Sequence, residues 1–147
     1  MGKMLMVALV GVAVAVTGTA RAEIIGECGA FEGYSYYYPG KNVKPSSSGW
    51  AKDKISSGST SITLIDKQFD VIYSGTVSKN RSSRANGAQI ILLGTNPDEA
   101  SITLLVGYPG VSAEFYTYHG LSKTLTLQTI RFNQLINSAK LLVAKCR

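Results

Sequence analysis

The chain has 147 residues, of which 45% are hydrophobic and 16% are charged, and its formal net charge is +6. This composition suits one small globular domain and excludes a disordered acidic or basic chain, because enough Val, Ile, Leu and Tyr are present to build a core. One His, two Cys and nine carboxylates leave few groups for an elaborate active site.

Met1–Ala22 has the pattern of a secretory signal peptide. Lys3 precedes the apolar run Met4–Val16, and small residues follow up to the position before Glu23. The run of about 13 residues is shorter than the roughly 20 that a membrane-spanning helix requires. We therefore expect cleavage before Glu23, export to the periplasm or the medium, no membrane span afterwards, and a single β domain over 23–147.

The mature chain carries a modest positive charge. Removal of the first 22 residues takes away Lys3 and Arg21 and leaves 13 basic and 9 acidic side chains, a net charge of +4. Such a field suits contact with anionic envelope material or phosphate-rich glycans. The expected partners are an anionic envelope glycan or another exported protein, and no nucleic acid is expected.

Cys28 and Cys146 stand near the two ends of the mature chain. In an oxidising compartment two such thiols pair, so we predict a disulfide between them. The bond would tie the first and last strands together and cover their edges. Two isolated cysteines and His119 lack the ligand spacing of a zinc site, so no metal and no cofactor are expected.

From Phe31 onward, short β-like runs alternate with turn residues and no window carries a helical stripe, which predicts an all-β fold. Phe31–Tyr38 is an aromatic-rich strand that a polar loop connects to Trp50. Ser59–Ile65 and Gln68–Tyr73 have hairpin spacing, and Thr76–Ser78 extends the sheet. The later predicted strands are Ala88–Leu93, which is expected to be buried, Ser101–Val106, Ala113–Tyr118, Leu121–Phe132 and Ala139–Cys146.

About eight antiparallel strands pack either as an up-and-down barrel or as a two-layer sandwich. The short connections favour a barrel-like meander. Asn80–Gly87 is predicted as a basic turn that ends in Asn-Gly, and Asn80 begins an N-glycosylation acceptor pattern. Asn133–Ala139 has an alternative interpretation as a short helical turn.

Residues for catalysis are sparse. His119 is the single histidine that could activate a serine, and the chain lacks a G-x-S-x-G elbow. No spacing singles out a pair among the carboxylates available for glycoside hydrolysis, which are Glu32, Asp53, Asp66, Asp70 and Glu114. We therefore predict a protein that is not an enzyme, with a small hydrolase using carboxylates as an alternative.

The most distinctive signal is aromatic. Three tyrosines alternate along the predicted strand Phe31–Tyr38 and so project to one face. Aromatic rings stack on sugars or bases, and neighbouring lysines hold phosphate or carboxylate. The alternative is that the rings pack across strands and the lysines belong to a solvated loop. The candidate ligand-binding residues are Tyr34, Tyr36, Tyr38, Trp50, Lys52 and Lys54.

Four segments carry a resemblance: Gly49–Gly58, Asp70–Tyr73, Glu114–Tyr116 and Ala144–Cys146. Through them the chain resembles small exported bacterial proteins of unassigned function. This resemblance implies a periplasmic or secreted β domain and brings no catalytic residue with it.

The periplasmic lysozyme inhibitors, which are small disulfide-bonded β-barrels, are similar in size, export and architecture. Their Ser-Gly-x-x-Tyr segment is echoed at best by Ala85–Gln89, which lacks the Ser and the Tyr. A net charge of +4 also opposes binding to cationic lysozymes. An inhibitor of a lysozyme or a protease is therefore an alternative to the leading expectation, an exported module that binds an envelope component.

Overall fold

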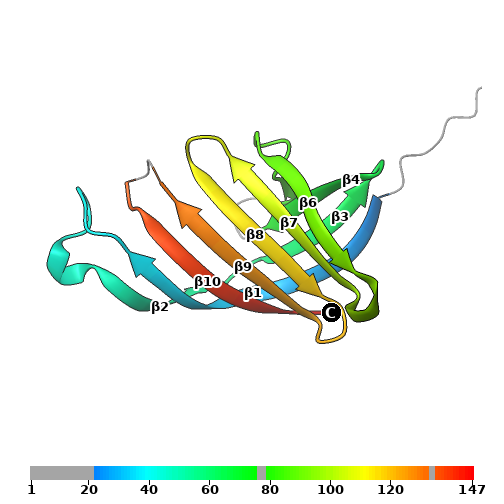
Figure 1. The fold of residues 1–147 in the computed structure, drawn as a ribbon, viewed down its shortest axis with the longest axis horizontal. Helices are drawn as coiled ribbons and strands as arrows, with labels where there is room; N and C mark the ends of the chain where they lie inside the picture. The colour runs from blue at the N-terminus through cyan, green and yellow to red at the C-terminus, as the bar shows by residue number, and fades with distance from the viewer. Residues whose placement is uncertain (1–21, 76–78, 133–134) are drawn as a thin grey trace, which may run out of the picture.

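One antiparallel sheet of ten strands makes up the part of the chain that the structure describes (Figure 1). The structure is a computed structural model that describes residues 22–75, 79–132 and 135–147. The predicted signal peptide, apart from Ala22, and Thr76–Ser78 lie outside the described residues. The elements are β1 (Ala22–Tyr37), η1 (Pro45–Ser47), β2 (Gly49–Ile55), β3 (Ser59–Ile65), β4 (Gln68–Ser74), β5 (Arg81–Ser82), β6 (Gln89–Asn96), η2 (Pro97–Glu99), β7 (Ser101–Tyr108), β8 (Ser112–His119), β9 (Thr124–Arg131) and β10 (Ser138–Cys146).

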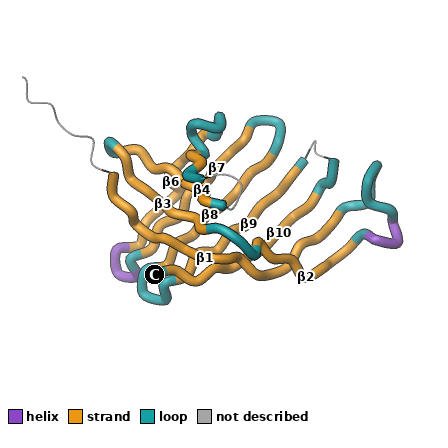
Figure 2. The backbone as a smooth tube through the Cα atoms, turned by 180° about the vertical axis from the view of Figure 1, so that it is seen from behind, coloured by secondary structure: helices purple, strands orange, loops and turns teal. Residues whose placement is uncertain are grey.

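The sheet curls into a half-barrel, in the order β5-β4-β3-β1-β10-β9-β8-β7-β6, with β2 paired to β1 outside this path. The first half of β1 pairs with β3, and its second half lies between β2 and β10. The register shifts between Cys28 and Phe31, and such bulges bend a strand. Figures 1 and 2 show the result, with β3 and β4 on the far side of the curve from β7 and β8. The predicted all-β, barrel-like meander is confirmed.

The predicted disulfide is confirmed between Cys28 and Cys146, which are 118 residues apart in sequence and directly opposite each other in the β1–β10 register. Cys28 lies within β1 and not at the start of the first strand, because β1 already begins at Ala22. The bond therefore joins the antiparallel first and last strands at the bend of β1.

Alternation along the strands builds the core on the concave side of the half-barrel. In β7, Ile102, Leu104 and Val106 are buried, while the residues between them are partly exposed. The same period places one face of β8 inside, where Ser112, Glu114 and Tyr116 are buried. The core comprises Cys28, Phe31, Ile62, Val71, Ala88, Ile102, Leu104, Val106, Tyr116, Leu125, Leu127, Leu142 and Ala144.

Two strands were not predicted. The segment expected to be a loop ending at Trp50 is followed by β2, every residue of which pairs with β1. The two-residue β5 pairs with β4 within the predicted basic turn. The described residues therefore form ten strands where eight were predicted, because β2 pairs with β1 and β5 pairs with β4.

The prediction of a buried strand over Ala88–Leu93 is wrong. The strand there is β6, and Ile91 and Leu93 are about half exposed, at 52% and 50%. Only Ala88, just before the strand, belongs to the core. Strand β6 is exposed because it lies at the edge of the sheet, where it pairs only with β7 among the described strands.

Some of the predicted turns agree with the structure and others are shifted along the chain. Asp66 and Lys67 have positive φ angles of 48° and 65°, as a two-residue hairpin between β3 and β4 requires. Gly87 has a positive φ of 88° in the predicted basic turn. Strand β9 begins only at Thr124, three residues after the predicted start, because Lys123 adopts a left-handed φ of 48°. In Asn133–Ala139, residues 133–134 lie outside the description and β10 begins at Ser138.

Candidate binding face

Strands β1 and β2 bring the six candidate residues onto one convex face, which we call the aromatic–lysine face: Tyr34, Tyr36, Tyr38, Trp50, Lys52 and Lys54. In the register of this pair, Tyr34 is opposite Lys52 and Tyr36 is opposite Trp50. Directly opposite residues of antiparallel strands project to the same side. The alternation predicted within β1 is confirmed, because Ser35, between Tyr34 and Tyr36, and Phe31, before them, are buried on the other side.

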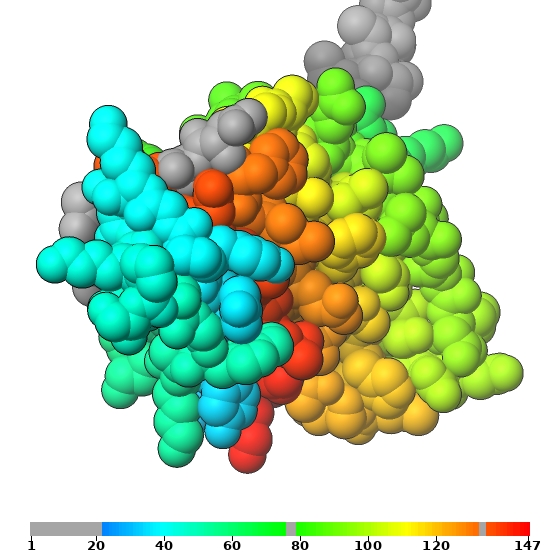
Figure 3. Space-filling view, turned by 60° about the vertical axis from the view of Figure 1, so that its left-hand side comes forward, coloured from blue at the N-terminus to red at the C-terminus, as the bar shows by residue number. Residues whose placement is uncertain are grey.

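The aromatic rings contact one another and remain open to solvent. Tyr36 makes edge-on contacts with Tyr38 and Trp50, with centroid distances of 5.0 and 5.4 Å. Tyr34, Tyr38 and Trp50 are 52%, 45% and 70% exposed. Figure 3 views this end of the molecule, where the cyan and teal residues of the β1–β2 region stand forward beside the red β10. Tyr36 thus packs against the ring of Trp50 across the two strands. The expected placement of the lysines in a loop is wrong for Lys52 and Lys54, which lie in β2. Ligand binding by this face stays a prediction.

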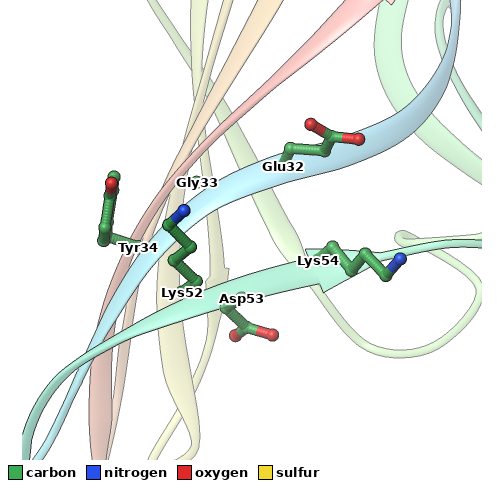
Figure 4. Close-up of a pocket in the computed structure, with 6 residues that line it drawn as sticks. All are labelled: Glu32, Gly33, Tyr34, Lys52, Asp53 and Lys54. Carbon is green, nitrogen blue, oxygen red and sulfur yellow. The ribbon is translucent and has the colours of Figure 1, made fainter.

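An open groove of about 740 Å³ lies beside Tyr34, lined by residues of β1 and β2 (Figure 4). Its lining adds Glu32, Gly33 and Asp53 to Tyr34, Lys52 and Lys54. Neither Lys52 nor Lys54 forms an ion pair with a described residue. The two lysines, the Tyr34 ring and the carboxylate of Glu32, which is opposite Lys54, thus border the groove.

The aromatic–lysine face continues into an apolar surface on β10 and β9. Tyr34 is opposite Leu141, which is 52% exposed, and Tyr36 is opposite Ala139, which is opposite Ile130. This part of the convex side is therefore apolar and solvent-exposed next to the lysines, a combination that suits carbohydrate rings or another protein surface.

On the concave side, Asp53 fastens β2 to the rest of the sheet. Its Oδ2 accepts hydrogen bonds from Ser35 Oγ and Lys140 Nζ, both at 2.6 Å. Burial raises the pKa of this carboxyl group, but the hydrogen bonds and the charge of Lys140 outweigh it, so the net pKa lies below the usual value. Lys140 is 87 residues away in the chain, so the sequence held no signal for this ion pair.

A second carboxylate, Glu114 on β8, is buried on the same concave side. Its Oε2 accepts hydrogen bonds from the hydroxyl groups of Tyr116, at 2.8 Å, and Tyr73, at 3.1 Å. Burial raises the pKa of Glu114 and the positive charge of Arg131 lowers it, with burial the larger effect. The sequence offered Glu114 among five carboxylates and gave no sign of its two tyrosine partners.

His119 lies between Glu99 and Ser122 at the turn from β8 to β9. Its Nε2 is 3.4 Å from Glu99 Oε2, and its Nδ1 is 3.0 Å from Ser122 Oγ. The backbone N–H of Ser122 also donates to Nδ1, so the contact closes the turn locally. The Glu99 side chain is 51% exposed and the turn projects into solvent. These three residues therefore lack the enclosed surroundings in which a serine is activated.

Within the described ranges, no group of three or more His, Cys, Asp or Glu side chains is placed to hold a metal ion. In the same ranges, no helix has the length and apolar character needed to cross a bilayer. Comparisons of the chain with protein-family models, with curated proteins and with solved structures found no match.

Proposed function

We propose that this protein is an exported, non-catalytic binding module that holds an anionic, glycan-like envelope component on the aromatic–lysine face. The observation that carries the proposal is the β1–β2 register, which sets Trp50 against Tyr36 and Lys52 against Tyr34 on one exposed surface. Rings of this kind stack on flat faces of a ligand, and adjacent ammonium groups pair with phosphate, sulfate or carboxylate.

The cost of exposing this surface supports the same proposal. Apolar area buried from water stabilises a protein by roughly 25 cal/mol per Å², so a 70% exposed Trp50 forgoes much of that gain. Isolated exposed apolar residues are common, but here three aromatic rings contact one another and Tyr34 lies opposite the exposed Leu141 on the same face. A contiguous exposed patch flanked by lysines is characteristic of an interaction site.

The test compares variants in retention on immobilised peptidoglycan, lipopolysaccharide and heparin at several salt concentrations. Trp50→Ala and Tyr36→Ala should each weaken binding by about 1 to 3 kcal/mol, because each removes a stacking ring. Lys52→Gln should weaken binding most at low salt, where charges are least screened.

Matched controls lie elsewhere on the surface. Phe132→Ala removes an exposed ring from the end of β9, and Lys67→Gln removes a cation from the β3–β4 turn. Both should bind like the parent, and circular dichroism should show that all the variants fold. The proposal fails if Trp50→Ala and Tyr36→Ala bind as tightly as the parent protein.

Other outcomes would favour the alternatives. Loss of lysozyme or protease activity at stoichiometric amounts of this protein would identify an inhibitor. Turnover of a glycan or an ester, abolished by replacement of one carboxylate or of His119, would identify a hydrolase. Export has its own measurement, because the intact mass of the protein in the periplasm or medium should correspond to a chain that begins at Glu23.

A further inference from the structure

A cavity of about 410 Å³ opens on the concave side of the half-barrel, across the sheet from the aromatic–lysine face. Ile55 and Val111, which are 44% and 41% exposed, contribute apolar surface, and the partly buried Tyr73 and Tyr108 contribute phenol rings. Its volume lies within the range of about 300 to 1,000 Å³ that is typical of small-molecule sites. The cavity is therefore large enough for one small ligand and has both apolar and polar walls.

Glu114 presents an unused acceptor to this cavity. The side chain belongs to a residue that is only 8% exposed, and both tyrosine hydroxyls donate to its Oε2. Oε1 accepts no hydrogen bond from a described residue. Since no fully buried side-chain oxygen of the described residues lacks a partner, Oε1 is open to the cavity. A buried carboxylate oxygen of this kind favours a ligand that donates a hydrogen bond.

Arg131 supplies the opposite charge at the exposed side of the same cavity. Thr129 lies directly opposite Glu114 in the β8–β9 register, and Arg131 is two residues further along β9 on the same face. Its guanidinium group forms no hydrogen bond or ion pair with a described residue. Lys140 also lines the cavity, but Asp53 already neutralises it. Arg131 is therefore the cation that remains available to a ligand anion.

We propose that this cavity binds a small zwitterion of the amino-acid type. Its ammonium group donates to Glu114 Oε1, its carboxylate pairs with the guanidinium of Arg131, and its apolar side chain packs against the exposed apolar lining of the cavity. A carboxylate and a guanidinium on neighbouring strands match the two charges of such a ligand, which are a few bonds apart.

Calorimetric titration of the folded protein with L-leucine tests the proposal. Leucine should bind, whereas N-acetyl-L-leucine, which lacks the ammonium, and 3-methylbutylamine, which lacks the carboxylate, should each bind at least about tenfold more weakly. The proposal is overturned if leucine neither binds nor raises the thermal midpoint, or if removing either charge leaves the affinity unchanged.

Variants locate the site. Glu114→Gln and Arg131→Gln should each weaken leucine binding at least about tenfold, whereas Asp98→Asn and Arg81→Gln, exposed controls of the same charge, should not. Equal weakening by the controls would overturn the assignment. If Glu114→Gln fails to fold, Arg131→Gln and the leucine analogues decide. Trp50→Ala should bind leucine like the parent, so failure of this proposal is distinguishable from failure at the aromatic–lysine face.

Discussion

At the scale of single residues, Asp53 controls the position of the aromatic–lysine face. Asp53 is the β2 residue between Lys52 and Lys54, and its side chain points to the opposite side of the strand (Figure 4). There it meets Ser35 of β1 and Lys140 of β10. One carboxylate thus joins three strands and reinforces the backbone ladder that pairs Lys52 with Tyr34 and Lys54 with Glu32.

Asp53→Asn should lower the free energy of unfolding by about 2 kcal/mol at neutral pH. This loss of stability lies between the values for exposed and for fully buried ion pairs, because the side chains of Lys140 and Asp53 are 17% and 19% exposed. Urea unfolding measures the change. Asp66→Asn in the exposed β3–β4 turn is the control, since Asn also tolerates its positive φ.

The stability of the parent protein and that of Asp53→Asn should depend differently on pH. The folded pKa of Asp53 lies below the usual value of 3.8, so its contribution is fully present above that pH and is lost as pH falls through the folded pKa. The stability difference between parent and Asp53→Asn should therefore be constant from neutral pH down to about 4 and shrink below it. A difference that grows on acidification would contradict the assigned ion pair.

At the scale of elements, Gly33 permits the close approach of β1 and β10. A Cβ at this position would fall on the backbone carbonyl of Leu141 and lie 2.9 Å from Leu142 Cα. Neither group is the flexible end of a side chain, so one of the strands would have to move.

Gly33→Ala should therefore destabilise the protein by about 3 kcal/mol or more, as overpacking against backbone does. Gly40→Ala is the matched control, because a Cβ there has nothing within 4 Å and Gly40 has no positive φ. Thermal and urea unfolding of both variants measure the difference. Equal stability of the two variants would show that the strands are not as close as described.

Period-2 patterns predicted most of the strands and the sharing of one face by Tyr34, Tyr36 and Tyr38. They missed β2, because its lysines and small residues carry no apolar alternation and pairing with β1 is what makes it a strand. They misjudged β6, because Ile91 and Leu93 have the composition of a buried strand and only the sheet order exposes them.

The polar contacts of Asp53 and Glu114 could not be predicted from the sequence, because their partners are far away in the chain. Asp53 and Lys140 are 87 residues apart, and Tyr73 and Glu114 are 41 apart. Asp53 and Lys140 meet because β2 and β10 both pair with β1, and Tyr73 and Glu114 meet because the sheet curls. No local pattern specifies either arrangement. The six candidate residues, by contrast, lie on two adjacent strands, so short-range periodicity was sufficient to group the tyrosines.

In the whole molecule, the Cys28–Cys146 disulfide links the first strand, β1, to the last strand, β10. Strands β1 and β10 are adjacent at the centre of the sheet order, and the bond closes a loop of 118 residues. In the chain-entropy model, a disulfide that closes a loop of this length lowers the conformational entropy of the unfolded chain. It thereby stabilises the folded state by about 4 to 5 kcal/mol.

Reduction should therefore lower the thermal midpoint by many degrees and leave the strand content unchanged below the new midpoint. The double variant Cys28→Ser, Cys146→Ser should have the lower midpoint with or without reductant. Far-ultraviolet circular dichroism follows both proteins. A midpoint of the parent protein that does not respond to full reduction would refute the stabilising role of the bond.

The fluorescence of Trp50 reports whether the ligand lies on the aromatic–lysine face. Trp50 is the single tryptophan of the chain and is 70% exposed, so its emission reports on this surface. Titration with whichever of peptidoglycan fragments, lipopolysaccharide or heparin is retained should shift the emission to shorter wavelength and saturate. Lys52→Gln should move the titration to higher ligand concentration. Saturable retention of the ligand with unchanged Trp50 emission would contradict the account.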